Sequence, residues 1–404
     1  MKKHFVIISN FYPPFSHVAS NRILAFAKYL DKKKFEVTVI TEKRKGIYPI
    51  IEGVNVVEVQ KTGLFNKLEF TNSKSKFNHK LRAVYNKILL SFKEDEYASW
   101  TNAVTKKISI INKEKKIDLL MASFAPISPI LAALNFLDRN PNVFFIADMR
   151  DEMSESPFIV ARRKEFLKSV EQKVFKTGNL ILSVSKPIVD GFCKLANDRI
   201  KCLEIRNGFD FEIKQDYRHN SIFKMLYLGT FYANRKPYLF FEALNELIES
   251  GEIDINKIEL EFIGPIHSYS VPNFVKPYFK QKDRIPHSDS LMEMKKADCL
   301  IVMHPNNGVK GIYTGKIFEY LGSCRPILGL LDEDDVAAKL LKEAEAGEVA
   351  DFHDKEKIKS AILQLYDNWR NKRAFEPKFD IIQRQNRKDQ VQFLNDHLLK
   401  HLNH

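Results

Sequence analysis

Short apolar runs and helical patterns alternate along the first half of the chain. Apolar runs of strand length predict strands at residues 5–9, 35–41, 54–59, 119–123, 143–148 and 180–184. Between them, apolar residues recur at helical spacing at residues 20–30, 100–111, 127–137 and 165–176. Ser20 stands at the start of the first periodic segment and is predicted to be its N-cap. This alternation predicts a parallel sheet with helices on both faces.

The same alternation restarts in the second half. Strands are predicted at residues 224–228, 259–263, 299–303 and 326–330, and helices at residues 238–250, 290–296, 316–321, 336–344 and 357–369. The polar segment between the halves contains Asn207-Gly208, a turn signal. The chain has 404 residues, more than one hydrophobic core usually supports.

We therefore expect an α/β protein with two Rossmann-like, doubly wound parallel-sheet domains that face a cleft. The first would span residues 1–206 and the second residues 207–380. Residues 381–404 would form a C-terminal helix that packs back on the first domain. Ligands of such sheets bind beyond the C-terminal ends of the strands, so the candidate functional residues are those that follow the strands.

Charge and cysteine content narrow the class of protein. The net charge of +13 and the isoelectric point of about 9.3 favour partners that carry phosphate, whether nucleotide, nucleic acid or anionic membrane, although a lysine-rich composition alone would give the same values. The four cysteines have neither CxxC nor zinc-finger spacing, so we expect no disulfide framework, no structural metal and a reducing, cytoplasmic compartment.

Two apolar stretches could be mistaken for targeting or membrane segments. The first apolar run is too short for a signal peptide. Residues 119–137 are long enough to span a bilayer, but Pro126 and Pro129 interrupt them. We interpret that stretch as a strand, a loop and the start of a helix.

The loop and helix start after the strand at 299–303 have the features of an anion site. Free backbone N–H groups at a helix N-terminus, the helix dipole and a lysine together attract a pyrophosphate. A carboxylate one turn later could accept hydrogen bonds from two ribose hydroxyls. A capped helix with a solvated Lys–Glu pair is the alternative. The candidate residues are Gly311, Tyr313, Thr314, Gly315, Lys316 and Glu319.

A second phosphate contact is predicted in the loop after the strand at 224–228. Gly229 and Thr230 end that strand, and glycine allows close backbone approach. Arg235 and Lys236 then supply positive charge on the same side of the sheet. An exposed basic turn is the alternative.

In the first domain, Asp148, Arg150 and Asp151 close a predicted buried strand. Three charges there are costly unless they are paired or used. They either form an internal Asp–Arg pair or line the cleft opposite the phosphates as catalytic residues.

The loop after the first strand should face the same cleft. Its polar side chains could touch the acceptor, although a lone histidine is more often structural. The candidates are Ser16, His17, Ser20 and Asn21.

Residues 61–93 form a strongly basic segment. They carry eight Lys or Arg residues against one acid, Glu69, and apolar residues recur at helical spacing from Leu81 to Phe92. A basic amphipathic helix can lie on an anionic membrane surface. A helix packed on the domain with a solvated basic face would give the same pattern.

Several motifs, in order along the chain, resemble the GT4-like glycosyltransferases of the GT-B superfamily, especially those of bacterial surface-polysaccharide assembly. The similar segments are Tyr12-Pro13-Pro14, Asp148-Met-Arg-Asp151, Asn207-Gly-Phe-Asp210, Leu228-Gly-Thr230, Thr314-Gly-Lys-Ile-Phe-Glu-Tyr-Leu321 and Arg325-Pro-Ile-Leu328. Their order and spacing are more specific than any one of them.

The resemblance implies a hexosyltransferase-like enzyme that moves a sugar from a UDP- or GDP-sugar to a glycan or lipid-linked acceptor, with retention of configuration and with no metal or other cofactor. Arg235, Lys236, Lys316 and helix N–H groups would hold the leaving pyrophosphate, and Glu319 would contact the ribose. The sequence departs from the family at Gly311, where the first Glu of the EX7E motif is expected, and no catalytic base is assigned.

Three alternatives stay open. A sugar-nucleotide epimerase would bind the same donor but needs acid and base side chains at the sugar. A nucleotide-binding scaffold without activity would also fit the loss of the first Glu. A basic nucleic-acid-binding protein fits the charge, but the sequence contains no recognition helix, zinc finger or aromatic RNA-binding pattern, so no nucleic-acid partner is expected.

Overall fold

The computed structural model divides the chain into two compact units. It describes residues 2–15, 17–61, 98–156, 159, 161–197, 200–230, 236–265, 270–304 and 309–402. One unit comprises Met1–Arg206 and Gln390–His404, and the other comprises Asn207–Asp389. Residues 381–389 belong to the second unit because Ile382 packs in the same core as Phe209 and the Phe209 amide donates to the Gln385 carbonyl.

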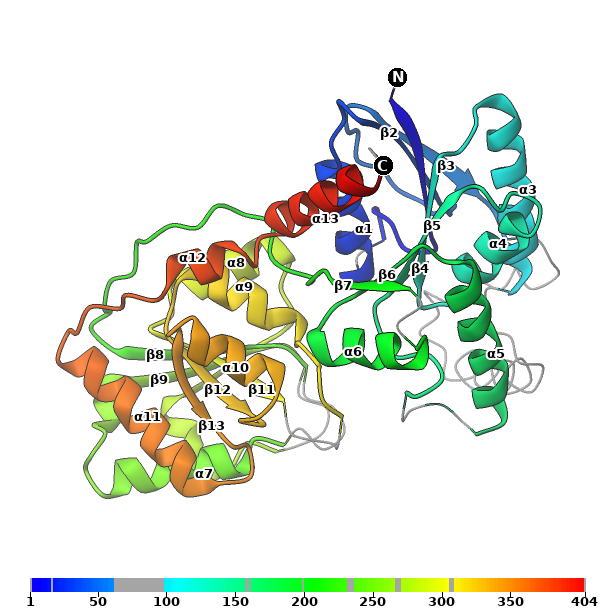
Figure 1. The fold of residues 1–404 in the computed structure, drawn as a ribbon. Helices are drawn as coiled ribbons and strands as arrows, with labels where there is room; N and C mark the ends of the chain where they lie inside the picture. The colour runs from blue at the N-terminus through cyan, green and yellow to red at the C-terminus, as the bar shows by residue number, and fades with distance from the viewer. Residues whose placement is uncertain are drawn as a thin grey trace. The chain divides into compact units, whose positions relative to one another are not determined.

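The first unit is built on a seven-stranded parallel sheet in the order β3-β2-β1-β4-β5-β6-β7 (Figure 1). Its strands are β1 (Lys3–Ser9), β2 (Phe35–Glu42), β3 (Val54–Val59), β4 (Leu119–Phe124), β5 (Phe144–Met149), β6 (Leu180–Ser183) and β7 (Lys201–Glu204). Its helices are α1 (Val18–Tyr29), α3 (Ala98–Glu114), α4 (Ser128–Leu137), α5 (Ala161–Thr177), α6 (Lys186–Leu195) and, from Gln390 onward, α13 (Arg387–Leu402).

Successive side chains of the buried strands pack alternately into two cores, one on each face of this sheet. On β1, Val6 and Ile8 belong to the core that includes residues of α3, α4 and α5. Phe5 and Ile7 belong to the core that includes residues of α1 and α13. The C-terminal helix therefore completes the first unit, and the Asn395 side chain on α13 donates to the Tyr29 carbonyl at the end of α1 (3.0 Å).

The second unit has a six-stranded parallel sheet in the order β10-β9-β8-β11-β12-β13. Its strands are β8 (Phe223–Leu228), β9 (Ile258–Ile263), β10 (Phe279–Lys282), β11 (Cys299–His304), β12 (Ile327–Leu331) and β13 (Gly347–Ala350). Its α-helices are α7 (Tyr238–Glu249), α8 (His287–Lys295), α9 (Gly315–Ser323), α10 (Val336–Glu343), α11 (Lys355–Arg370) and α12 (Phe379–Gln383). One core lies under α7 and α11 and the other under α9 and α10.

The predicted fold class of two parallel-sheet α/β domains is confirmed. Residues 119–137 form β4, a loop and α4, as interpreted from the sequence. Within the described residues, no helix is long and apolar enough to cross a membrane.

Two kinds of local prediction were wrong or missing. The strands β7, β10 and β13 were missed because each has only four residues and few fully buried positions. The N-cap of α1 is His17, whose Nδ1 accepts from the Ala19 amide (3.1 Å), and Ser20 lies buried in the first turn.

Candidate functional site

Strand order in the second sheet reverses between β8 and β11, and this reversal positions the candidate donor site. Open α/β sheets bind ligands at such a switch point, beyond the carboxyl ends of the strands. Gly229 and Thr230 directly follow β8 there. The Gly229 amide donates to the Ile263 carbonyl (3.0 Å), and a Cβ on Gly264 would lie only 1.9 Å from the Gly229 oxygen. Gly229 and Gly264, the first residues after β8 and β9, therefore pack backbone against backbone.

The chain enters α9 at the same edge. Thr314 is the N-cap of α9, but its side chain makes no capping hydrogen bond. Its hydroxyl oxygen is buried and has no hydrogen-bond partner among the residues that the structure describes. Because the first amides of a helix lack partners within it, this N-terminus offers both N–H donors and a hydroxyl to a ligand. Tyr313, another predicted site residue, packs against Phe318 with tilted rings and 5.0 Å between ring centroids.

Glu319 lies one turn into α9 and is only 8% exposed. Lys316 Nζ lies 2.9 Å from one carboxylate oxygen, and His287 Nε2 lies 2.7 Å from the other. Burial alone would raise the pKa of Glu319, but the hydrogen bond from His287 and the charge of Lys316 lower it to about 2. The carboxylate is thus held ionised, and each oxygen keeps a lone pair that can accept from a ligand hydroxyl.

The Lys–Glu pair that the sequence offered as an alternative is therefore present, but its carboxylate is buried. Lys316 is one-third exposed, so it can face a ligand while it holds Glu319. Sequence reasoning missed His287, the first residue of α8, because nothing near it in the chain marks a partner of α9.

The backbone at Gly311 is held by Asp335, a residue that the sequence did not single out. The φ of Gly311, +86°, is in the left-handed region that favours glycine. Its amide donates to Asp335 Oδ1 (2.7 Å), and the same oxygen accepts from the Val336 amide (2.8 Å) as the N-cap of α10. Asp335 therefore anchors the loop before α9. The cap could have been found from its position before the apolar pattern of α10.

The basic loop after β8 is only partly described. Arg235 lies outside the described residues. Lys236 is exposed and lies just before α7.

In the first unit, Asp148 lies in a buried ion pair and not on an accessible surface. Asp148 is fully buried at the end of β5 and forms an ion pair with Arg22 (2.7 Å). It also accepts from the Ser123 hydroxyl (2.7 Å), and Arg22 donates to the Ile205 carbonyl (2.6 Å). The internal Asp–Arg pair that the sequence left open as an alternative exists, but its arginine comes from α1 and not from position 150.

Arg150 and Asp151 have different surroundings from Asp148 and from each other. Arg150 donates to the Phe124 carbonyl (2.7 Å) and to the Ala125 carbonyl, so it supports the loop after β4. Burial lowers its pKa. Asp151 is exposed and stays available.

Two of the four predicted acceptor residues, His17 at the N-cap of α1 and Asn21 within α1, are at least partly exposed. His17 is exposed and packs against Phe11, with 4.8 Å between ring centroids. Because its Nδ1 accepts a hydrogen bond, the neutral ring carries its proton on Nε2. Burial and the charge of Arg150 lower the pKa of His17, against the opposing effect of Asp151. Asn21 is half-buried.

Of the other two acceptor candidates, Ser20 is fully buried in the first turn of α1. Ser16 lies outside the described residues.

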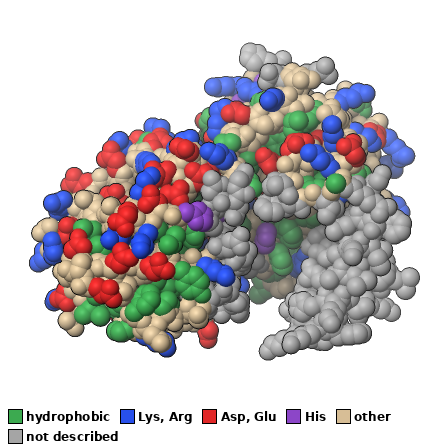
Figure 2. Space-filling view, turned by 90° about the horizontal axis from the view of Figure 1, so that it is seen from below, with side chains coloured by type: hydrophobic (Ala, Val, Ile, Leu, Met, Phe, Trp, Pro, Cys, Tyr) green, Lys and Arg blue, Asp and Glu red, His purple; other side chains and the backbone are tan. Residues whose placement is uncertain are grey.

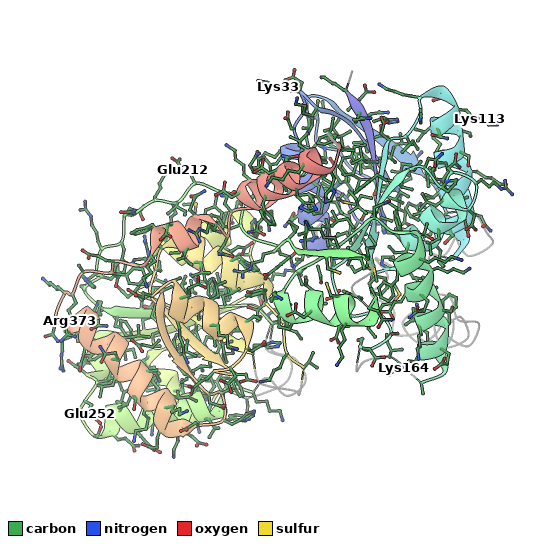
Figure 3. All side chains as sticks on the ribbon, in the orientation of Figure 1. Lys33, Lys113, Lys164, Glu212, Glu252 and Arg373 are labelled. Atoms are coloured by element: carbon green, nitrogen blue, oxygen red, sulfur yellow. The ribbon has the colours of Figure 1, made fainter. Side chains whose placement is uncertain are left out.

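Two cavities lie elsewhere in the second unit, of about 380 and 390 Å³, and both are lined by Trp369. The first is also lined by Arg373, just beyond α11 and labelled in Figure 3. Neither includes residues of α9, so the candidate site rests on the switch point and not on cavity size. In the described part of the chain, no group of three or more His, Cys, Asp or Glu residues could hold a metal ion.

Comparison with solved structures shows the fold. The chain is similar to a sucrose-phosphate synthase from Thermosynechococcus elongatus, with 13% identity, a TM-score of 0.66 and 99% of both chains covered. It is also similar to HepE from Anabaena in complex with UDP and glucose, with 11% identity, a TM-score of 0.61 and full coverage of both chains. A trehalose-6-phosphate protein from E. coli bound with UDP-2-fluoro glucose matches with 10% identity, a TM-score of 0.60 and 98% coverage of both.

These likenesses show that the two units have the α/β organisation of the GT-B fold. No family model matches the sequence, and no curated protein matches it.

Proposed function

We propose that the protein is a glycosyltransferase that uses a UDP- or GDP-sugar and transfers the sugar to a glycan or lipid-linked acceptor in cell-surface polysaccharide assembly. The observation that carries the proposal is the buried, ionised Glu319 one turn inside an uncapped helix N-terminus at the switch point of the second sheet. A nucleoside diphosphate matches this arrangement, since its phosphates suit the helix N-terminus and its ribose suits the carboxylate. HepE and the E. coli protein carry UDP or a UDP-sugar on the same fold.

The chemistry follows from the charge that develops on the leaving nucleotide. Helix N–H groups, the Thr314 hydroxyl and the Lys316 ammonium would stabilise the diphosphate as the sugar leaves. In a retaining reaction, a phosphate oxygen of the leaving group would take the proton of the attacking acceptor hydroxyl. No metal or other cofactor is needed for this step, because the cationic groups supply the electrostatic stabilisation.

The acceptor would bind at the loop after β1 in the first unit. His17 presents its Nε2–H as a hydrogen-bond donor. Asp151 is exposed, and its negative charge acts on the His17 ring. The basic segment 61–93, nearly all of which lies outside the described residues, would add contact with an anionic membrane surface. We do not propose a nucleic-acid partner, because such a partner needs a continuous basic surface. On the face drawn in Figure 2, acidic side chains are interspersed with basic ones over the described surface.

A thermal-shift screen with UDP, GDP, ADP, CMP and their sugar conjugates tests the donor site. A ligand at 100 times its dissociation constant stabilises the native state by about 2.7 kcal/mol. One diphosphate should shift the melting temperature, and Glu319→Gln and Lys316→Ala should abolish the shift. Glu333→Gln is the matched control, since Glu333 also pairs with two lysines, Lys342 of α10 and Lys357 of α11. No shift with any nucleotide would refute the proposal.

Product analysis separates transfer from the competing activities. Transfer requires the sugar to appear on an added acceptor with the nucleotide released. An epimerase would change the sugar of the donor with no acceptor present, and an inactive scaffold would bind the nucleotide without turnover.

A further inference from the structure

The connection between β2 and β3 carries two isoleucines that the fold leaves in solvent. Ile47 is 90% exposed and Ile50 is 100% exposed. Single exposed apolar residues are common on protein surfaces. A branched aliphatic side chain with its whole surface in water, however, adds nothing to the packing of its own unit. Two of them within four residues point to a role outside the fold.

The backbone beneath these isoleucines is held in place. The Tyr48 hydroxyl accepts from the Arg44 amide (2.9 Å), and Tyr48 packs against the core that includes α1. Gly46 has a φ of +131°, and a Cβ there would lie 2.8 Å from the ring of Pro14. The isoleucines are therefore presented on a fixed support.

Cationic residues flank the isoleucines on one side. Lys43 and Lys45 are exposed, and Arg44 lies between them with its guanidinium 4.6 Å from the centroid of the Phe15 ring. Residues 43–51 include no acid, and Glu52 follows them. Arg44 is paired with Glu42 at the end of β2, so the exposed Lys43 and Lys45 carry the charge of the segment. Peripheral proteins bind anionic lipid with this combination, since the apolar side chains enter the head-group boundary and the cations meet the phosphates.

The segment also adjoins the candidate acceptor loop. It leaves β2 at the carboxyl end of the strand, which is the edge of the first sheet that carries the loop after β1. Phe15 of that loop contacts Arg44, and the Phe15 ring lies 6.0 Å from the ring of His17. A surface bound by residues 43–51 would therefore lie next to His17.

We propose that residues 43–51 dock the first unit on an anionic phospholipid surface, with Ile47 and Ile50 entering the boundary between head groups and acyl chains. The inference deepens the proposed function and rests on it for one step, in which the bilayer supplies a lipid-linked acceptor to the loop after β1. A second copy of the chain is a poorer occupant, because two isolated aliphatic side chains fall far short of the roughly 800 Å² per partner that a stable interface buries.

Vesicle flotation with the full chain tests the proposal. The probes are vesicles of phosphatidylcholine alone and of phosphatidylcholine mixed with phosphatidylglycerol, each at low and high salt. The test variant is Ile47→Ser/Ile50→Ser. The matched control is Ile222→Ser/Ile255→Ser, which removes two isoleucines that are 40% and 41% exposed on the second unit. A further variant, Lys43→Gln/Lys45→Gln, tests the charge.

The wild type should bind the anionic vesicles. The Ile47/Ile50 variant should lose about 100-fold in partitioning, roughly tenfold for each side chain. The lysine variant should lose roughly 25-fold at low salt and little at high salt. The control variant should bind like the wild type.

Three results would overturn the docking surface. They are a wild type that binds no vesicle, an Ile47/Ile50 variant that binds as tightly as the wild type, and a wild-type dimer in sedimentation that the same variant abolishes. Nucleotide thermal shifts, measured on every variant, test the proposed function separately. Lost vesicle binding with a retained shift supports the surface in a folded protein, whereas a wild type without any shift refutes the donor site and leaves the vesicle result to judge the surface.

Discussion

Replacement of Glu319 by glutamine should destabilise the second unit in a way that depends on pH. The pKa of Glu319 is lowered from an ordinary value of 4.5 to about 2, because His287 and Lys316 stabilise the charge more than burial opposes it. That difference corresponds to about 3 kcal/mol of folding free energy at pH 7. The pKa is depressed in the folded state, so this stabilisation is present above about pH 4.5 and is lost as the pH falls toward 2.

Tryptophan fluorescence can isolate the second unit in this experiment. The chain has two tryptophans, Trp100 in the first unit and Trp369 in the second, and both are buried. In a Trp100→Phe background, urea unfolding reports Trp369 alone and avoids the assumption that both units unfold together. Glu319→Gln should lower the free energy of unfolding by about 3 kcal/mol at pH 7 and by only about 1.5 kcal/mol at pH 3.

The matched control is Glu333→Gln in the same background. Glu333 pairs with Lys342 and Lys357 at the surface, so its removal should cost at most about 1 kcal/mol. If Glu319→Gln costs no more than the control at pH 7, or costs the same at pH 3 as at pH 7, the charge on Glu319 is not held by its neighbours and the reasoning fails.

Three further changes test the other buried or positioned groups. Asp148→Asn should lower the free energy of unfolding of the first unit by about 3–5 kcal/mol, because Arg22 then keeps a buried charge without its partner. Trp100 fluorescence in a Trp369→Phe background measures this loss, and the nucleotide thermal shift should not change. Asp335→Ala removes the cap of α10 and the anchor of Gly311, so it should cost about 1–2 kcal/mol in the second unit and weaken nucleotide binding in a titration. His17→Ala should raise the KM for the acceptor and leave the nucleotide thermal shift intact; a reduced shift would place His17 in donor binding instead.

The main elements of the fold could be predicted from apolar periodicity, because most strands of both sheets are buried along nearly their whole length. The strands β1 and β4 are continuous apolar runs for this reason. The edge strand β10 reads Phe-Lys-Gln-Lys with three exposed positions, so its sequence contains no strand signal. What places it is its pairing with β9, which depends on the rest of the sheet.

The candidate site could be predicted only where its parts are neighbours in the chain. Lys316 and Glu319 are three residues apart on one helix, so their proximity follows from helical geometry. His287 reaches Glu319 across 32 residues, and Arg22 reaches Asp148 across 126. These pairs depend on how α8 packs beside α9 and how α1 packs on the sheet, which no local pattern specifies.

The same limit explains why Asp148 and Glu319 could not be told apart from the sequence. Both are acids beside a basic residue, and both are buried in the structure. The difference lies in the exposure of their partners: Arg22 is 3% exposed, whereas the Lys316 and His287 side chains are 34% and 58% exposed. A ligand cannot replace the arginine as partner of a carboxylate when both side chains are buried, since breaking that pair would leave a buried charge unpaired. It can join a carboxylate whose partners already face water, because the Lys316 ammonium can turn toward a phosphate while the carboxylate accepts a hydroxyl. We assign the candidate site to the start of α9 and not to the end of β5 on that physical ground.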